Sequence, residues 1–190
     1  MNAPRLALFA YGSLVSPDSA TATIGRPVTP SAALRLPGWR RRWSVARDNT
    51  TVEKTFARPD GSIPDHVLGL TIEPSDADAD GPNGALLGLD EEELRRLDVR
   101  EMRYDRIEVA PMAGFDRVFA YRAKPAHRVS EPPRGAVVIA AYAERVESAF
   151  AALGEDQLRL YRETTGPPPV EVIDAVLVRD RIPPGNPREW

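Results

Sequence analysis

Two short segments carry residue types that could form one active site. The first, residues 11–14, reads Tyr-Gly-Ser-Leu and ends the apolar run Leu6–Ala10. Where a strand breaks into a turn that contains glycine, its backbone N–H groups no longer belong to a sheet and can turn toward an anionic ligand. The second segment places a carboxylate, Glu101, after an acidic helix and before a new strand that begins near Tyr104. One carboxylate in such a place can act as a general acid and base.

The two motifs, in this order, resemble the gamma-glutamylcyclotransferase-like family. Its signature is an N-terminal Tyr-Gly-Ser-Leu loop and a downstream Glu followed by Tyr-x-Arg, which here is Tyr104-x-Arg106. The resemblance implies that Glu101 is the catalytic residue. It also implies that the substrate-binding residues are Tyr11, Gly12, Ser13, Leu14 and Tyr104.

The reaction implied by this resemblance is intramolecular and needs no cofactor. The α-amine of a gamma-glutamyl group attacks the side-chain carbonyl, which releases an amine or amino acid and leaves 5-oxoproline. The backbone N–H groups of residues 12–14 would hold the α-carboxylate, so that nitrogen and carbonyl carbon lie about 3–3.5 Å apart. Glu101 would carry the proton from the attacking to the leaving nitrogen. Partial burial would raise its pKa from about 4.3 toward neutrality, where such a shuttle works best.

Three alternatives stay open at this stage. Glu101 could instead be a structural residue at a helix end, paired with Arg103 or Arg106. Many relatives carry Gly after the catalytic Glu, whereas this chain has Met102, so a non-catalytic binding or regulatory module of the same fold is the alternative function. Ser13 could act as a nucleophile, but its surroundings do not form a Gly-x-Ser-x-Gly elbow.

Composition excludes several other classes of function. The 190 residues carry a net charge of −3, which disfavours a nucleic-acid-binding role. There is no cysteine and only two histidines, so thiolate chemistry and metal sites based on Cys or several His are excluded. The acidic loop 76–80 resembles part of a calcium-binding loop, but Leu87 stands where a bidentate Glu is required, and we expect no calcium binding.

The expected partner is therefore a small-molecule gamma-glutamyl substrate, and the expected assembly is a monomer or a homodimer. No stretch approaches the run of about 20 apolar residues that a membrane span requires. The apolar run near the N-terminus is shorter than the core of a signal peptide. We expect a cytoplasmic protein that keeps this segment.

The elements that must position these residues are short and mixed. The alternation of apolar residues and the spacing of 19 prolines predict strands over 5–10, 33–46, 67–72, 105–111, 117–121 and 170–178. Helices are predicted over 18–25, 90–100 and 136–165, the last interrupted at Gly154. As a strand, 39–43 would place Trp39, Arg41 and Trp43 on one face, with Arg41 a candidate for the cavity wall. Together with the resemblance, this predicts an α+β fold: a small mixed β-sheet curled into a barrel with flanking helices. One domain would span residues 1–182, followed by a Pro-rich tail, 183–190.

Overall fold

The central element is the strand that leads into the Tyr-Gly-Ser-Leu motif. The computed structural model describes residues 4–31, 33–51, 53–76 and 80–187. A five-stranded sheet has the order β2-β6-β1-β8-β7. Its strands are β1 (Leu6–Ala10), β2 (Ala33–Arg35), β6 (Asn83–Leu89), β7 (Tyr104–Val109) and β8 (Arg117–Ala123). β1 pairs antiparallel with β6 and parallel with β8, and all five of its residues are buried. Burial on both faces explains why β1 is a continuous apolar run rather than an alternating one.

The part of the chain that the structure describes contains three further strand pairs. They are β3 (Trp39–Asp48) with β5 (His66–Pro74), β4 (Lys54–Ala57) with β11 (Val176–Asp180), and β9 (Val138–Ile139) with β10 (Val172–Ile173). A single bridge between Val67 and Val137 joins β5 to β9. β5 also reaches the five-stranded sheet, because Thr71 Oγ1 accepts a hydrogen bond from the backbone of Ala123 at 2.8 Å. The strands around the site are thus tied to one another.

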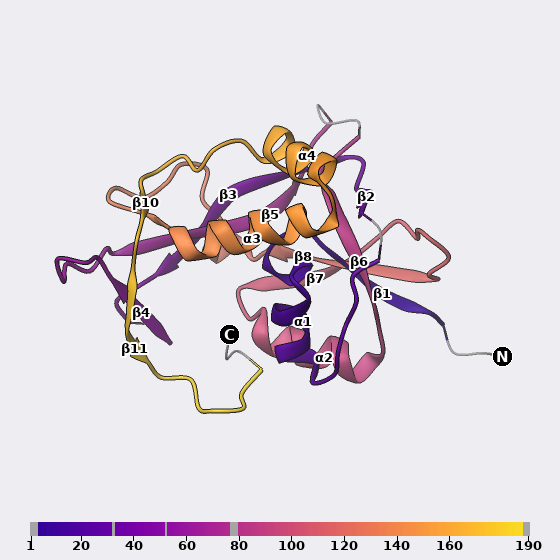
Figure 1. The fold of residues 1–190 in the computed structure, drawn as a ribbon, viewed down its shortest axis with the longest axis horizontal. Coiled ribbons are helices and arrows are strands. Elements are labelled where there is room, and N and C mark those ends of the chain that lie inside the picture. The colour runs from indigo at the N-terminus through magenta and orange to yellow at the C-terminus, as the bar shows by residue number, and fades with distance from the viewer. Residues whose placement is uncertain (1–3, 32, 52, 77–79, 188–190) are drawn as a thin grey trace.

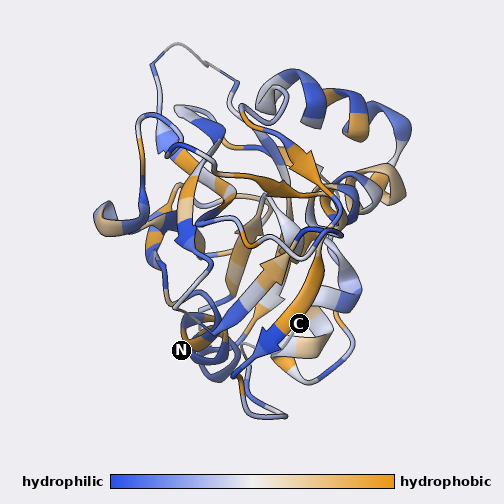
Figure 2. Cartoon of the chain, turned by 90° about the vertical axis from the view of Figure 1, so that its left-hand side faces the viewer, coloured by the Kyte–Doolittle hydropathy of each residue, from blue (hydrophilic) through white to orange (hydrophobic). Residues whose placement is uncertain are grey.

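Within the described residues, four α-helices pack around the strands. They are α1 (Pro17–Ile24), α2 (Glu91–Arg100), α3 (Ala140–Leu153) and α4 (Glu155–Thr165), and short 3₁₀ helices cover Ser13–Val15 and Pro125–His127. α3 and α4 lie along β3 and β5, whereas α1 and α2 lie together below them in the view of Figure 1. Hydrophobic segments gather on the central strands, and hydrophilic ones on the outer loops (Figure 2).

Buried Arg41 joins β3 to these helices. Its guanidinium lies 4.9 Å from the ring centroid of Phe150 in α3 and 4.6 Å from that of Tyr161 in α4. It also donates hydrogen bonds to the backbone and side-chain oxygens of Asn83, at 2.7 and 2.8 Å. Arg41 therefore holds layers of the fold together and, contrary to the possibility raised from the sequence, does not line the cavities described below.

The predicted elements are found, with several corrections. The strand predicted over 33–46 is two strands, because the chain turns at Gly38, whose φ is +78°. The C-terminal strand predicted over 170–178 is likewise two, β10 and β11. The long helix begins only at Ala140, after β9, and breaks at Gly154 as expected. The sequence does not predict β4, β6 or β9 as strands, and β9 lies within the segment expected to be helical.

The α+β class is confirmed, but the barrel is not. β2 and β7 are the two edges of the five-stranded sheet, and no sheet closes on itself within the described ranges. Residues 77–79 of the acidic loop and 188–190 of the Pro-rich tail lie outside the described residues, so the calcium expectation stays a prediction. The described part of the chain has no helix with the length and apolar character needed to cross a membrane.

Candidate functional site

Helix α2 delivers Glu101 to the site. It begins with a reciprocal cap, in which Asp90 Oδ1 accepts from the backbone N–H of Glu93 at 2.8 Å and Glu93 Oε2 accepts from that of Asp90 at 2.9 Å. The acidic first turn also suits the positive end of the helix dipole. The helix ends at Arg100, and the N–H of Glu101 still donates to Leu97 O at 2.8 Å. The Glu101 side chain therefore leaves from a fixed helix end.

The carboxylate of Glu101 is largely buried beside one cation. Only 17% of its side chain is exposed, and Oε1 lies 3.1 Å from Arg100 Nε. The other oxygen, Oε2, forms no hydrogen bond with any of the described residues. Burial raises the pKa of Glu101, while the charges of Arg100 and Arg103 act against this rise. A carboxylate with a raised pKa and a free oxygen is suited to accept and return a proton.

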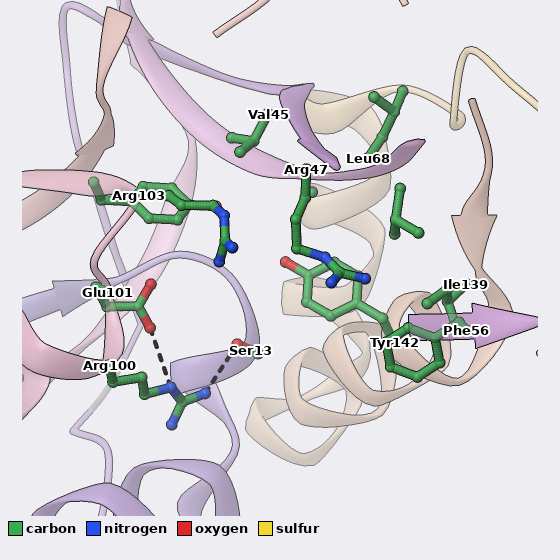
Figure 3. Close-up of a pocket in the computed structure, with 13 residues that line it drawn as sticks. Ser13, Val45, Arg47, Phe56, Leu68, Arg100, Glu101, Arg103, Ile139 and Tyr142 are labelled. Carbon is green, nitrogen blue, oxygen red and sulfur yellow. Dashed lines mark hydrogen bonds and ion pairs between the residues drawn. The ribbon is translucent and has the colours of Figure 1, made fainter. Parts of the chain in front are cut away.

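Arg100 holds this end of α2 against α1 and the Tyr-Gly-Ser-Leu loop. Nη1 donates to Ser19 O at 2.7 Å and to Thr23 Oγ1 at 2.6 Å, and Nη2 donates to Ser19 Oγ at 2.8 Å. A longer contact of 3.5 Å joins Nη2 to Ser13 Oγ. Figure 3 shows Arg100 bridging Glu101 and Ser13. The two motifs seen in the sequence thus meet through one guanidinium group.

The loop after β1 presents unused backbone donors. Gly12 O and Ser13 O accept from the N–H groups of Val15 and Ser16, at 3.0 and 3.1 Å. The N–H groups of Gly12, Ser13 and Leu14 have no acceptor among the residues that the structure describes. Gly12 has a φ of −135°, so it is not needed for a left-handed turn. A Cβ there would lie 3.6 Å from the Tyr142 hydroxyl oxygen, an ordinary contact distance, so only a side chain larger than that of alanine would occupy the cavity.

Tyr11 and Tyr104 both use their hydroxyl protons within the protein. Tyr11 donates to Tyr121 O at 2.6 Å, and Tyr104 donates to Leu70 O at 2.8 Å. Burial is the main cause that raises the pKa of each phenol, so both stay protonated near neutral pH. Each hydroxyl oxygen can still accept a hydrogen bond. Tyr11 therefore lines the small cavity without offering it a free proton donor.

Two cavities meet at Glu101. All six residues singled out from the sequence line the smaller one, of about 50 Å³: Tyr11, Gly12, Ser13, Leu14, Glu101 and Tyr104. The larger, of about 150 Å³, extends toward β3, β4 and β9. Both cavities are lined by Ser13, Glu101, Tyr104 and Tyr142. A ligand that bridges them would pass directly over the Glu101 carboxylate.

Some residues of the site carried no sequence signal. Tyr142 from α3 lines both cavities, and Arg47 and Arg103 project toward the larger one (Figure 3). Tyr142 matched the apolar spacing of its helix, which concealed its place at the site. Arg106 pairs instead with Asp98 at 3.5 Å and lines neither cavity. Within the described ranges, no three His, Asp or Glu side chains are grouped to hold a metal ion.

Comparison with solved structures identifies the fold. An uncharacterized human protein, LOC79017, superposes with a TM-score of 0.58 at 19% identity over 83% of this chain and 87% of its own. A gamma-glutamyl cyclotransferase gives 0.54 at 19% identity over 82% and 86%. YkqA from Bacillus subtilis gives 0.53 at 16% identity, and this chain spans 54% of it. No family model matches the sequence, and no curated protein matches it significantly. The chain thus has the gamma-glutamyl cyclotransferase-like fold expected from its motifs.

Proposed function

We propose that this protein is a cofactor-independent gamma-glutamyl cyclotransferase-type enzyme that converts a gamma-glutamyl group to 5-oxoproline. One observation carries the proposal: the free amides of residues 12–14 and the buried carboxylate of Glu101 line the same small cavity. The fold shared with a solved gamma-glutamyl cyclotransferase supports it independently of these residues.

The amides of the loop hold the glutamyl head. The N–H groups of Gly12, Ser13 and Leu14 offer three donors to an α-carboxylate, and clustered backbone donors of this kind form an anion-binding concavity. The small cavity then forces the glutamyl chain to bend, which brings the α-nitrogen toward the γ-carbonyl carbon. Such positioning lowers the entropic part of the activation free energy.

Glu101 moves the proton that the chemistry requires. Its carboxylate takes a proton from the α-ammonium, and the free amine then attacks the γ-carbonyl carbon to form the ring C–N bond. Protonated Glu101 gives this proton to the leaving nitrogen as the original amide C–N bond breaks. The ring nitrogen still carries two hydrogens after the attack, and it passes one of these protons through Glu101 to the released amine. The products are 5-oxoproline and the released amine, and the carboxylate is regenerated. All of these proton transfers use Glu101, whose pKa is raised above that of an ordinary glutamate.

Neither alternative function gains support at the site. Met102, the one residue that suggested a non-catalytic module, is 40% exposed and lines neither cavity. Ser13 contacts the cation of Arg100, and no basic side chain among the described residues accepts its hydroxyl proton. A serine nucleophile would need such a base.

Incubation with a panel of gamma-glutamyl amino acids, peptides and amines tests the proposal. We expect at least one compound to release 5-oxoproline and its amine in equal amounts. Release of free glutamate in place of 5-oxoproline would indicate hydrolysis and contradict the proposed cyclisation. Tight binding of these compounds without any product would favour the binding module.

A further inference from the structure

The larger cavity combines an apolar wall with positive charge. Its wall is made by Val45, Phe56, Val67, Leu68 and Ile139. Arg47 and Arg103 line the same space, and their guanidinium groups reach it from different strands and loops (Figure 3). The small cavity differs in that it is lined by the loop 11–14 and by four tyrosines, and no arginine among the described residues lines it. The two cavities are therefore built for different parts of a ligand.

Arg47 is held in place but lacks a carboxylate partner. Nη1 donates to Lys54 O at 2.6 Å, Nη2 donates to Asn49 Oδ1 at 3.2 Å, and the guanidinium lies 5.4 Å from the Phe56 ring centroid. No Asp or Glu side chain in the described ranges forms an ion pair with it. The nearby carboxylate of Asp48 instead accepts hydrogen bonds from Thr50 and Thr51.

The positive charge of this cavity is only partly compensated. Arg103 forms an ion pair with Glu53 at 2.7 Å, whereas Arg47 has none. Burial, and secondarily the charge of Arg103, lowers the pKa of Arg47 to about 10, so it remains a cation at neutral pH. Arg47 is a preorganised, partly buried guanidinium that makes no direct ion pair among the described residues, although the charges of Glu53 and Asp48 also favour its charged form. Such a group is a suitable partner for a carboxylate.

We propose, on the basis of the function proposed above, that the larger cavity binds the leaving group, which is an apolar amino acid whose free carboxylate is held by Arg47. Because Glu101 lies where the two cavities meet, the scissile amide is placed at their junction. In a gamma-glutamyl amino acid, the carboxylate and the side chain both branch from the carbon next to the leaving nitrogen. The carboxylate reaches Arg47, and the apolar side chain packs on Phe56 and Ile139.

A matched substrate pair tests this assignment. L-γ-glutamyl-L-leucine and γ-glutamyl-isoamylamine differ only in the carboxylate of the leaving group. We expect kcat/KM for 5-oxoproline release to be at least tenfold higher for the dipeptide, because a charge-assisted hydrogen bond is lost with the amine. In Arg47→Met the ratio should fall to about one. Arg40→Met, on the same strand but outside the cavities and 44% exposed at its side chain, should keep the parent ratio.

A binding measurement separates this inference from the proposed reaction. Calorimetry with Glu101→Gln protein compares the same two compounds without turnover. Tighter binding of the dipeptide by about tenfold, lost in Glu101→Gln/Arg47→Met, would support the subsite even if no 5-oxoproline were ever released. Equal affinities in Glu101→Gln, or a preference that survives the loss of Arg47, would overturn it while leaving the cyclotransferase proposal intact.

Discussion

Burial and two neighbouring arginines have opposite effects on the pKa of Glu101, and their balance sets the pH range in which Glu101 can act as a base. Burial disfavours the ionised carboxylate, whereas Arg100 and Arg103 favour it, and the net effect is a raised pKa. A base must be ionised to accept a proton. The rate should therefore increase with pH through the pKa of Glu101, above the ordinary glutamate value of about 4.3.

Removal of Arg103 should shift the acid limb of the pH profile, the range in which the rate increases with pH, to higher pH. Arg103 favours the charged form of Glu101, so Arg103→Met raises the pKa further, and the enzyme must reach a higher pH before the base is ionised. The measurement is the pH profile of kcat/KM for a substrate found in the panel. Arg95→Met, a 61% exposed side chain on α2, serves as the control and should not move the limb. A limb that stays in place or moves to lower pH in Arg103→Met would contradict this account.

At the scale of elements, the proposed function requires the loop after β1 to bind substrate through its backbone N–H groups. Gly12→Val should lower kcat/KM sharply, because the branched side chain starts from a Cβ 3.6 Å from the Tyr142 hydroxyl oxygen and fills the small cavity. Ser13→Ala should cost much less, since its hydroxyl makes only a 3.5 Å contact with Arg100. Steady-state kinetics of both variants decide the matter. Loss of activity in Ser13→Ala, with activity intact in Gly12→Val, would instead indicate that the Ser13 side chain reacts.

The cap of α2 contributes to stability rather than to chemistry. Asp90→Ala removes the acceptor of the Glu93 N–H, and we expect the free energy of unfolding to fall by about 1 kcal/mol. Ser16 precedes α1 but makes no side-chain capping bond, so Ser16→Ala is the control and should change stability little. Urea unfolding measures both. An unchanged midpoint for Asp90→Ala would show that the cap is not needed to hold this helix.

Elements with local signals were predictable, and those that depend on distant neighbours were not. β1, α2 with its Asp90 cap, and the break at Gly154 follow from apolar runs, capping residues and glycine. β6 follows Pro82 and carries two glycines, Gly84 and Gly88, which weaken its signal as a strand although most of its other residues are apolar. It is a strand because β1 and β2 pair with it on both sides.

At the scale of the whole molecule, the site depends on how closely β6 approaches β1. A Cβ on Gly84 would lie 2.4 Å from Ala10 O and 2.6 Å from Phe9 Cζ. Gly84→Ala should therefore force the strands apart and cost roughly 1–3 kcal/mol in the free energy of unfolding. Gly88→Ala, on the same strand, meets the Phe115 ring only at 3.4 Å and should cost less. Equal losses for the two variants, measured by urea unfolding, would contradict this explanation.

The candidate site was predictable only in part for the same reason. Its six motif residues lie in two segments and could be read from the chain, and they do line one cavity. Arg47 and Tyr142 come from β3 and α3 and reach the site only through the tertiary packing of those elements. No spacing along the sequence relates Arg47 to Glu101. The residues proposed to select the leaving group were thus visible only in the folded molecule.

The most direct test of the central claim is the rate of 5-oxoproline release by Glu101→Gln. The amide is nearly isosteric but cannot take the ammonium proton, so we predict a fall in kcat of about 10²–10⁴-fold with substrate binding retained. Glu92→Gln, on the same helix with a 63% exposed side chain, should match the parent. If Glu101→Gln turns over substrate within a few-fold of the parent, Glu101 is not the proton shuttle and the account is contradicted.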